Sequence, residues 1–311
     1  MKRLLTILFA VCVVFNTAAT SLHSHEEATL RILAIGNSFS DDAMEYLPAI
    51  LDDLGISNVE VSRLYIGGCS LQQHLDLYNN HRAEYIFSRS LPGENRWVQQ
   101  PGKASLKEAL EAAQWDIITL QQQSGRSGEY ESYEPYLGEL IKIIRQAQPS
   151  ARIAWHMTWS YSSDSKHGDF HRYNHSPQQM IQSIYLASRQ VEFNNPEIDI
   201  IIPSGTTIQS LRMSAINNHP QDLTRDGYHM GWGVGRYALA CTWYEELIAP
   251  YTGITMMGNG VHSNKGNIAV TPLTAAYCQK AAKAAVRNNY RPKQINHPTR
   301  LIRRIEHSQN K

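Results

Sequence analysis

The chain has 311 residues, 42% of them hydrophobic, and a formal net charge of +1. This length is enough for one large hydrophobic core, so we expect a single folded domain. A charge so close to zero gives no support for nucleic acid or an anionic membrane surface as a partner.

The first 20 residues are typical of a secretory signal peptide. Lys2 and Arg3 precede the apolar run LLTILFAVCVVF, and small residues follow at 17–20. The run is too short to span a membrane comfortably. Cys12 lies inside it, but Val11 makes a poor lipoprotein cleavage site, so a lipid anchor is the less favoured alternative. We therefore expect an exported protein, periplasmic or extracellular, without stable membrane insertion.

Three cysteines follow this segment, at positions 69, 241 and 278. Three cysteines allow one disulfide at most, which excludes a disulfide-rich scaffold. The sequence leaves open whether Cys241 and Cys278 pair.

Five short apolar runs predict strands, and the amphipathic segments between them predict helices. The predicted strands are 31–35, 59–65, 115–120, 151–156 and 198–202. The predicted helices are 43–54, 70–89, 105–113, 132–149, 176–193, 233–248 and 272–288. Residues 91–102 contain two prolines and two glycines, and they predict a loop or a small hairpin.

This alternation predicts an α/β fold: a three-layer αβα sandwich around a doubly wound, mainly parallel five-stranded sheet. We expect the fold to cover residues 28–290, and the basic tail at 291–311 to be solvated or frayed. In such sheets the functional site lies outside the carboxyl ends of the strands. The residues that directly follow the first four predicted strands include Ser38, Gly68, Gln121, Gln122 and His156.

Ser38 lies in the stretch RILAIGNSFSDD, between a buried strand and the next helix. Gly36 permits a sharp exit from the strand, and Ser40, Asp41 or Asp42 is expected to cap the helix. Backbone N–H groups and the positive end of the helix dipole favour a nucleophile whose attack creates an oxyanion. An ordinary capping serine is the alternative interpretation.

A second polar segment, D-G-Y-H, lies near the far end of the chain. It places Asp226 three residues before His229, with Gly227 freeing the backbone between them. This spacing lets the carboxylate accept the Nδ1–H of the imidazole, which leaves Nε2 facing outward as a base. Taken alone, such a pair is more often a capping turn.

The order of these segments resembles the SGNH hydrolases, also called the GDSL esterase/lipase superfamily, over roughly residues 31–247. GNSFS at 36–40 is similar to the first block, which implies Ser38 as the nucleophile. IGGCS at 66–70 is similar to the second block, which implies that the N–H of Gly68 helps to form the oxyanion hole. D-G-Y-H is similar to the last block, which implies Asp226 and His229 as the other triad members.

The chain also departs from this pattern. Asn37 and Phe39 replace an aspartate and a leucine, and LQQQS at 120–124 stands where the third block carries an asparagine. A glutamine has the same amide donor on a longer stem. Because side chains alternate along a strand, only one of the pair faces the site readily. We expect Gln122 to donate to the oxyanion, with Gln121 as the alternative.

The resemblance implies a flavodoxin-like fold and an exported serine esterase, a carboxylic ester hydrolase that needs no metal or organic cofactor. The expected substrates are small-molecule or polysaccharide esters, above all O-acetyl or other acyl groups on carbohydrates. His156 and Trp159 are expected to contact the substrate, with core packing as the alternative. The altered third block motivates the alternative function of a non-catalytic glycan-binding protein.

Overall fold

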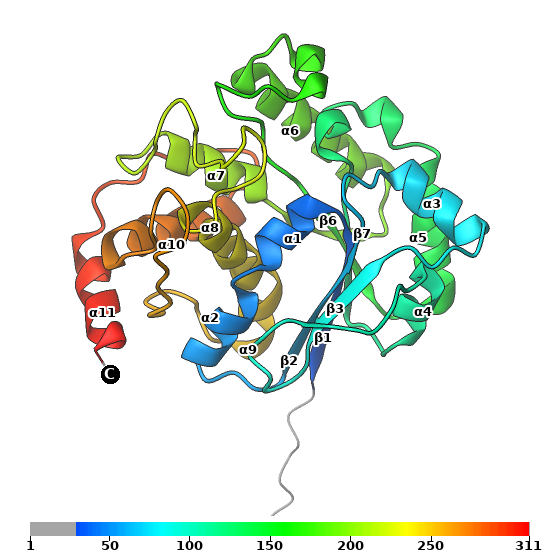
Figure 1. Ribbon diagram of the computed structural model, residues 1–311, viewed down its shortest axis with the longest axis horizontal. Helices are drawn as coiled ribbons and strands as arrows, with labels where there is room; N and C mark the ends of the chain where they lie inside the picture. Colours follow the sequence, from blue (N-terminus) through cyan, green and yellow to red (C-terminus); the bar gives the residue numbers. More distant parts are fainter. Residues whose placement is uncertain (1–28, 311) are drawn as a thin grey trace, which may run out of the picture.

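A computed structural model describes residues 29–310. The predicted signal peptide and the alternative lipid anchor therefore lie outside the described residues. The core of the fold is one seven-stranded sheet with the order β4-β3-β2-β1-β5-β6-β7 (Figure 1). The strands are β1 Leu30–Gly36, β2 Val59–Tyr65, β3 Ile86–Ser90, β4 Val98–Gln99, β5 Ile117–Leu120, β6 Arg152–His156 and β7 Ile198–Ile202.

The five predicted strands are confirmed as the parallel part of this sheet. Their spatial order, β2-β1-β5-β6-β7, is that of a flavodoxin-like fold. The central strand β1 is buried from Ile32 to Ile35 because helices cover both faces of the sheet, and this explains its unbroken apolar run. The order of the strands reverses beside β1, so their carboxyl ends diverge where Ser38 follows.

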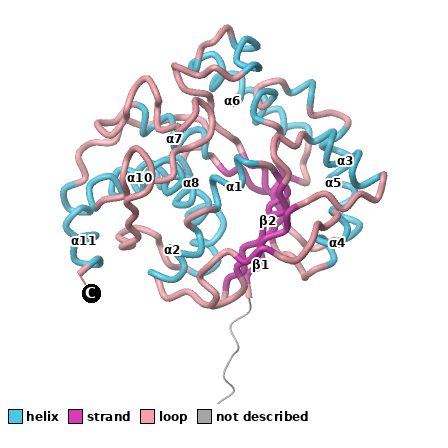
Figure 2. Tube along the Cα trace, viewed as in Figure 1, coloured by secondary structure: helices cyan, strands magenta, loops and turns pink. Residues whose placement is uncertain are grey.

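Helices pack on both faces of the sheet, which gives the predicted three layers (Figures 1 and 2). One side carries α1 Ser38–Met44, α2 Leu47–Asp53, α7 Ser204–Arg212, α8 Val234–Trp243 and α10 Pro272–Val286. The other side carries α3 Leu71–Asn79, α4 Leu106–Glu111 and α5 Tyr136–Ala147. The remaining helices are α6 Pro177–Asn194, α9 Ala249–Thr252 and α11 Thr299–Gln309, with short 3-10 helices at 124–126, 130–132 and 168–173 and a π-helical turn at 244–248.

The sheet is larger than predicted because the segment 70–89 is not one helix. Helix α3 ends at Asn79, and His81 then adopts a left-handed conformation with a φ of 52°. The chain returns as β3, which pairs antiparallel with β2 and β4. Arg89 of β3 binds the buried Glu60 of β2 at 2.7 Å, so a side-chain ion pair supports this pairing. The hairpin interpretation of 91–102 fits the turn between β3 and β4.

The start of the first helix and the end of the chain also differ from prediction. Helix α1 begins at Ser38 itself, with Asn37 as its N-cap, and a separate helix, α2, begins at Leu47 with Pro48 in its first turn. The basic tail is not frayed over its whole length, because α11 packs on α10 through the buried side chains of Leu301 and Ile305. Helix α7 was not predicted.

Two further observations concern the described residues. Cys69, Cys241 and Cys278 are buried free thiols, so Cys241 and Cys278 do not pair. Between residues 29 and 310, the structure contains no helix with the length and apolar character needed to cross a membrane.

Candidate active site

Ser38 is the first residue of α1, directly after the carboxyl end of β1. Asn37 caps this helix: its Oδ1 accepts the N–H of Phe39 at 3.0 Å, and its backbone carbonyl accepts the N–H of Asp41. The N–H of Ser38 itself has no protein acceptor among the described residues, as expected at the first position of a helix. A Cβ at Gly36 would lie 2.4 Å from Ser40 Oγ, so a larger residue there would displace the Ser40 side chain, whose hydroxyl donates to the Asn37 carbonyl.

Ser38, His229 and Asp226 form one hydrogen-bonded chain. The hydroxyl of Ser38 lies 2.8 Å from Nε2 of His229, and Nδ1 of His229 lies 2.7 Å from Oδ2 of Asp226. A carboxylate can only accept, so the hydrogen of the neutral ring sits on Nδ1 and Ser38 donates to Nε2. The other Asp226 oxygen accepts the backbone N–H of His229 at 2.8 Å, which fixes the carboxylate relative to the ring.

The environment of Asp226 favours its ionised form. Partial burial alone would raise the pKa of this carboxyl, but hydrogen bonds from the ring and the backbone N–H of His229 hold the pKa below its ordinary value. Arg225 adds a positive charge, with its Nε 4.0 Å from Asp226. The carboxylate can therefore orient the imidazole and stabilise its protonated form.

The segment 225–236 is held against α1 by Asp42, a residue that we expected only as a helix cap. One oxygen of this buried carboxyl binds Arg225 at 3.1 Å and Arg236 at 2.5 Å, and the other accepts the N–H of Met230 at 2.8 Å. Burial raises the pKa of Asp42, and the two guanidinium groups oppose that rise. This cluster joins the two distant halves of the site, and no sequence motif indicated it.

Gly68 lies in a tight turn beside the Ser38 turn. The N–H of Cys69 bonds the carbonyl of Ile66 at 3.3 Å, and Gly68 has the positive φ, +66°, that this turn requires. The side-chain amide of Asn37 donates to the Cys69 carbonyl at 2.9 Å, which ties the two turns together. Among the described residues, no protein group accepts the N–H of Gly68.

A buried hydrogen-bond relay reaches Asn37 from the carboxyl ends of β5, β6 and β7. Asn37 Oδ1 accepts the Nε2–H of Gln121 at 2.7 Å, and Gln121 Oε1 accepts from His156 Nδ1 at 2.7 Å. Nε2 of His156 accepts from the hydroxyl of Ser204 at 2.9 Å. Burial lowers the pKa of His156 to about 3, so the ring is neutral. Each hydrogen bond of the relay therefore has one defined donor and one defined acceptor.

Gln122, which we expected to donate to the oxyanion, has other partners in the structure. Its Nε2 donates to the carbonyl and the hydroxyl of Ser132 at 3.0 and 3.2 Å, and its Oε1 accepts the backbone N–H groups of Leu71 and Gln123. The side chain therefore anchors the start of α3 instead of facing Ser38. The alternation along the strand holds, but the residue on the Ser38 side is Gln121.

His156 and Trp159, the two residues that we expected to contact substrate, are both fully buried. Trp159 stacks flat on Phe39, with ring centroids 4.1 Å apart, and its Nε1 donates to the carbonyl of Tyr228 at 2.8 Å. It thus packs against the neighbour of Ser38 and the neighbour of His229. These contacts of Trp159 are those of the alternative interpretation, core packing.

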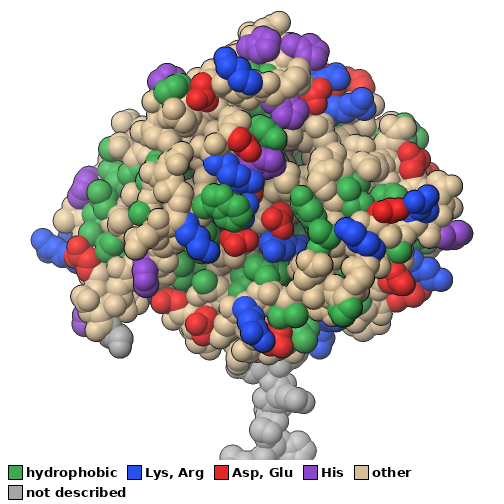
Figure 3. Space-filling view, in the orientation of Figure 1, with side chains coloured by type: hydrophobic (Ala, Val, Ile, Leu, Met, Phe, Trp, Pro, Cys, Tyr) green, Lys and Arg blue, Asp and Glu red, His purple; other side chains and the backbone are tan. Residues whose placement is uncertain are grey.

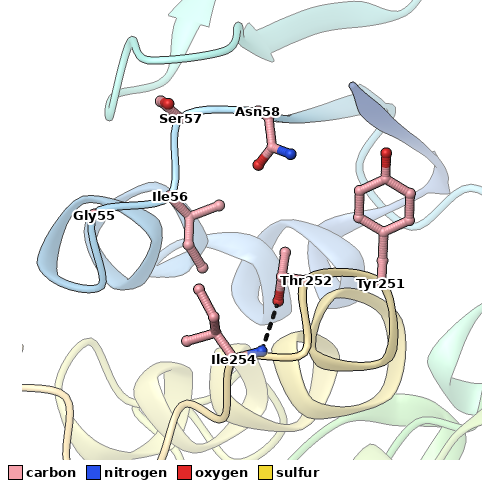
Figure 4. A pocket seen from close by; sticks show the side chains of 7 residues that line it. All are labelled: Gly55, Ile56, Ser57, Asn58, Tyr251, Thr252 and Ile254. Carbon is pink, nitrogen blue, oxygen red and sulfur yellow. Dashed lines mark hydrogen bonds between the residues drawn. The ribbon is translucent and has the colours of Figure 1, made fainter. Parts of the chain in front are cut away.

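The triad side chains are partly exposed, 15% for His229 and 38% for Asp226. Figure 3 shows the face over α1, where acidic, basic, histidine and hydrophobic side chains gather near the centre. The cavity drawn in Figure 4, of about 320 Å³, is lined by 55–58 and by Tyr251, Thr252 and Ile254. It adjoins the amino end of β2, so it lies at the opposite edge of the sheet from Ser38. Within residues 29–310, no group of three histidine, cysteine or acidic side chains is placed to hold a metal ion.

The fold and the site together define a class: an α/β protein of flavodoxin-like topology with a hydrogen-bonded serine, histidine and aspartate at the carboxyl edge of its sheet. The chain belongs to the family described as Domain of unknown function (DUF4886), whose model matches residues 31–285.

The solved structures include relatives of very different similarity. A DUF4886 family protein from Bacteroides uniformis is 33% identical, with a TM-score of 0.77 over 86% of this chain and 98% of that one. A proposed SGNH hydrolase from Slackia heliotrinireducens is 18% identical, with a TM-score of 0.43 over 65% and 90%. An acetylxylan esterase from Geobacillus stearothermophilus is 11% identical, with a TM-score of 0.46 over 74% and 97%. A search of the curated proteins found no match.

Proposed function

We propose that this protein is an exported serine esterase of the SGNH type that hydrolyses O-acyl esters, above all acetyl esters, on carbohydrates. The observation that carries this proposal is the hydrogen-bonded order of Ser38, His229 and Asp226, with contacts of 2.8 and 2.7 Å. Export rests on the signal-peptide pattern of the first 20 residues, and the carbohydrate class rests on the resemblance to the superfamily.

The reaction follows from the direction of these hydrogen bonds. His229 Nε2 takes the proton of Ser38 as its Oγ attacks the acyl carbon, and Asp226 stabilises the imidazolium that forms. The N–H groups of Ser38 and Gly68 are free to stabilise the tetrahedral oxyanion. His229 then gives its proton to the leaving alcohol as the ester bond breaks. Water, activated by the same imidazole, attacks the acyl-serine and releases the acid and the free hydroxyl.

The test is hydrolysis of p-nitrophenyl acetate together with labelling by a fluorophosphonate probe. We expect Ser38→Ala and His229→Ala each to lower kcat by about 10³-fold or more, to a similar floor, because triad members act as a unit. Asp226→Asn should cost less than His229→Ala. The probe should label the wild type and not Ser38→Ala.

A matched control is Ser57→Ala, which removes an exposed hydroxyl at the opposite edge of the sheet. It should keep wild-type labelling and turnover. Wild-type turnover in Ser38→Ala, or a wild-type protein that neither reacts with the probe nor hydrolyses any acetyl ester, would contradict an esterase function.

A further inference from the structure

The surface beside the triad offers an aromatic ring with an exposed face. Trp232 follows His229 by three residues, and 42% of its side chain is exposed. Most other large aromatic rings of the site, such as Phe39 and Trp159, are buried. A tryptophan combines a large apolar face with a polar N–H, so an exposed ring beside the triad is suited to bind a ligand.

The ring of Trp232 is held firmly from beneath. The guanidinium carbon of Arg236 lies 3.5 Å from the ring centroid, and that of Arg225 lies 5.1 Å away. Both guanidinium groups bind the same Asp42 oxygen, at 2.5 and 3.1 Å, so we infer that they lie under the same face of the ring. The opposite face is then the one that is open to solvent.

The backbone of Trp232 is fixed as well. Its carbonyl accepts the hydroxyl of Tyr46 at 2.7 Å. A Cβ at Gly266 would lie 3.1 Å from the Trp232 nitrogen, so the segment around residue 266 packs tightly behind it. A ring that is already ordered loses little conformational entropy when a ligand stacks on it.

Arg225 contacts both this ring and the triad, and its Nη2 group is available to donate a hydrogen bond. Its Nη1 binds Asp42 and the carbonyl of Met230, and its Nε lies 4.0 Å from Asp226. Among the described residues, Nη2 of Arg225 has no protein acceptor, and a quarter of the side chain is exposed. An open aromatic face and a free guanidinium donor thus lie together beside the His229–Asp226 pair.

We propose that Trp232 and Arg225 form a subsite for a sugar ring of the leaving group. The C–H face of a pyranose stacks on the open face of Trp232, and Nη2 of Arg225 donates to a ring hydroxyl or carboxylate oxygen. His229 protonates the leaving alcohol, so the alcohol part of the ester lies on the side of the 225–236 segment. This inference rests on the proposed esterase function and adds the group that the enzyme recognises.

The experiment compares two acetyl esters, p-nitrophenyl acetate and an acetylated xylo-oligosaccharide, on the same variants. Trp232→Ala should lower kcat/KM for the oligosaccharide at least tenfold more than it lowers kcat/KM for p-nitrophenyl acetate, mainly through KM. Trp232→Leu still covers the two arginines but has no flat ring, so it should show the same selective loss. Trp232→Tyr keeps an aromatic ring, so it should retain much of the wild-type preference for the oligosaccharide over p-nitrophenyl acetate.

The matched control is Phe193→Ala, which removes an aromatic ring that is 87% exposed on α6, away from the site. It should leave the ratio of the two kcat/KM values unchanged. Thermal unfolding checks that each variant is folded. Equal losses for both esters in folded Trp232→Leu would overturn the subsite, and Trp232 would then only cover the arginines.

Failure of the esterase proposal would look different, because the wild type would hydrolyse neither ester. In that case calorimetric titration with the deacetylated xylo-oligosaccharide measures the subsite directly. Binding by the wild type that weakens at least tenfold in Trp232→Leu supports the subsite. Equal affinity in both proteins, or no binding by the wild type, overturns it.

Discussion

Asn37 determines the local geometry around Ser38 more than any other side chain. Its Oδ1 accepts from Phe39 and Gln121, and its Nδ2 donates to the Cys69 carbonyl, so one amide joins α1, β5 and the Gly68 turn. In the sequence this residue shows only as a replacement within the first block. Its role could not be predicted, because all but one of its partners depend on how the strand ends meet in space.

At the scale of single residues, the two glutamines after β5 lead to a prediction. Gln121→Ala leaves Asn37 with a lost donor and His156 with an unpaired Nδ1–H, both in a buried place where unpaired polar groups are costly. Asn37 then orients the Ser38 and Gly68 turns less well, and we expect kcat to fall about tenfold or more with KM little changed. Steady-state kinetics on p-nitrophenyl acetate measure both constants.

Gln122→Ala is the matched control for that prediction. It frees the start of α3 and the Ser132 loop, so it should lower the melting temperature while kcat stays within about threefold of the wild type, a range too small for a lost oxyanion donor. If Gln122→Ala lost as much kcat as Gln121→Ala, the two amides would not have the separate tasks that their hydrogen bonds indicate.

At the scale of elements, the parallel strands were predictable and several of their neighbours were not. Buried parallel strands appear as unbroken apolar runs, which is why Ile32–Ile35 and Ile198–Ile202 were found. β3 was missed because Tyr85 and Ile86 fit a helical spacing with Leu71 and Leu75. The decisive signal, the pairing of Arg89 with Glu60, is a tertiary contact. The serine and histidine segments were found through their motifs. A motif can identify residues in a turn, where hydrophobic residues follow no helical or strand pattern.

Helix α1 and the 225–236 segment are coupled through Asp42, which gives a second prediction. Asp42→Ala leaves Arg236, a side chain only 3% exposed, without its closest counter-charge. Breaking a buried pair in this way costs about 3–5 kcal/mol. The 225–236 segment should also loosen, so turnover should fall beyond what the loss of stability explains. Urea unfolding and kcat of the folded fraction measure the two effects.

The adjacent residue provides the comparison. Asp41 pairs with Arg63 at 2.9 Å where both side chains stay partly exposed to water, and ion pairs that water can screen contribute only about 0–1 kcal/mol. Asp41→Ala should therefore change the free energy of unfolding by no more than that. A similar loss in both variants would mean that the Asp42 cluster does not hold the segment.

At the scale of the whole molecule, two buried histidines make stability depend on pH. Burial lowers the pKa of both His74 and His156 from 6.5 to about 3. Below pH 6.5 the unfolded chain binds protons that the folded chain does not, so stability is full above pH 6.5 and falls as the pH drops toward 3. Each histidine should contribute a loss of about 2 kcal/mol between pH 7 and pH 5.

The measurement is urea unfolding at pH 7 and pH 5 for the wild type and for His156→Gln, which keeps a donor and an acceptor. Burial raises the pKa of Glu246 to about 7, which acts in the opposite direction, so the difference between proteins is the informative quantity. His156→Gln should reduce the acid loss, while His262→Gln, at an exposed position, should not. Equal pH dependence in all three proteins would rule out buried neutral His156 as a cause.

The contact between Asn37 and Gln121 also constrains how this sequence can evolve. The two residues are 84 positions apart in the sequence and are joined by one hydrogen bond, from Nε2 of Gln121 to Oδ1 of Asn37. An aspartate at 37 has no hydrogen for the Cys69 carbonyl, and an asparagine at 121 is one methylene too short to span the same gap between Asn37 and His156. A change at one position should therefore select for a compensating change at the other. The test is a library that randomises both codons and is selected for ester hydrolysis. Among the selected variants, the frequency of each residue pair at 37 and 121 should differ strongly from the product of the two single-position frequencies.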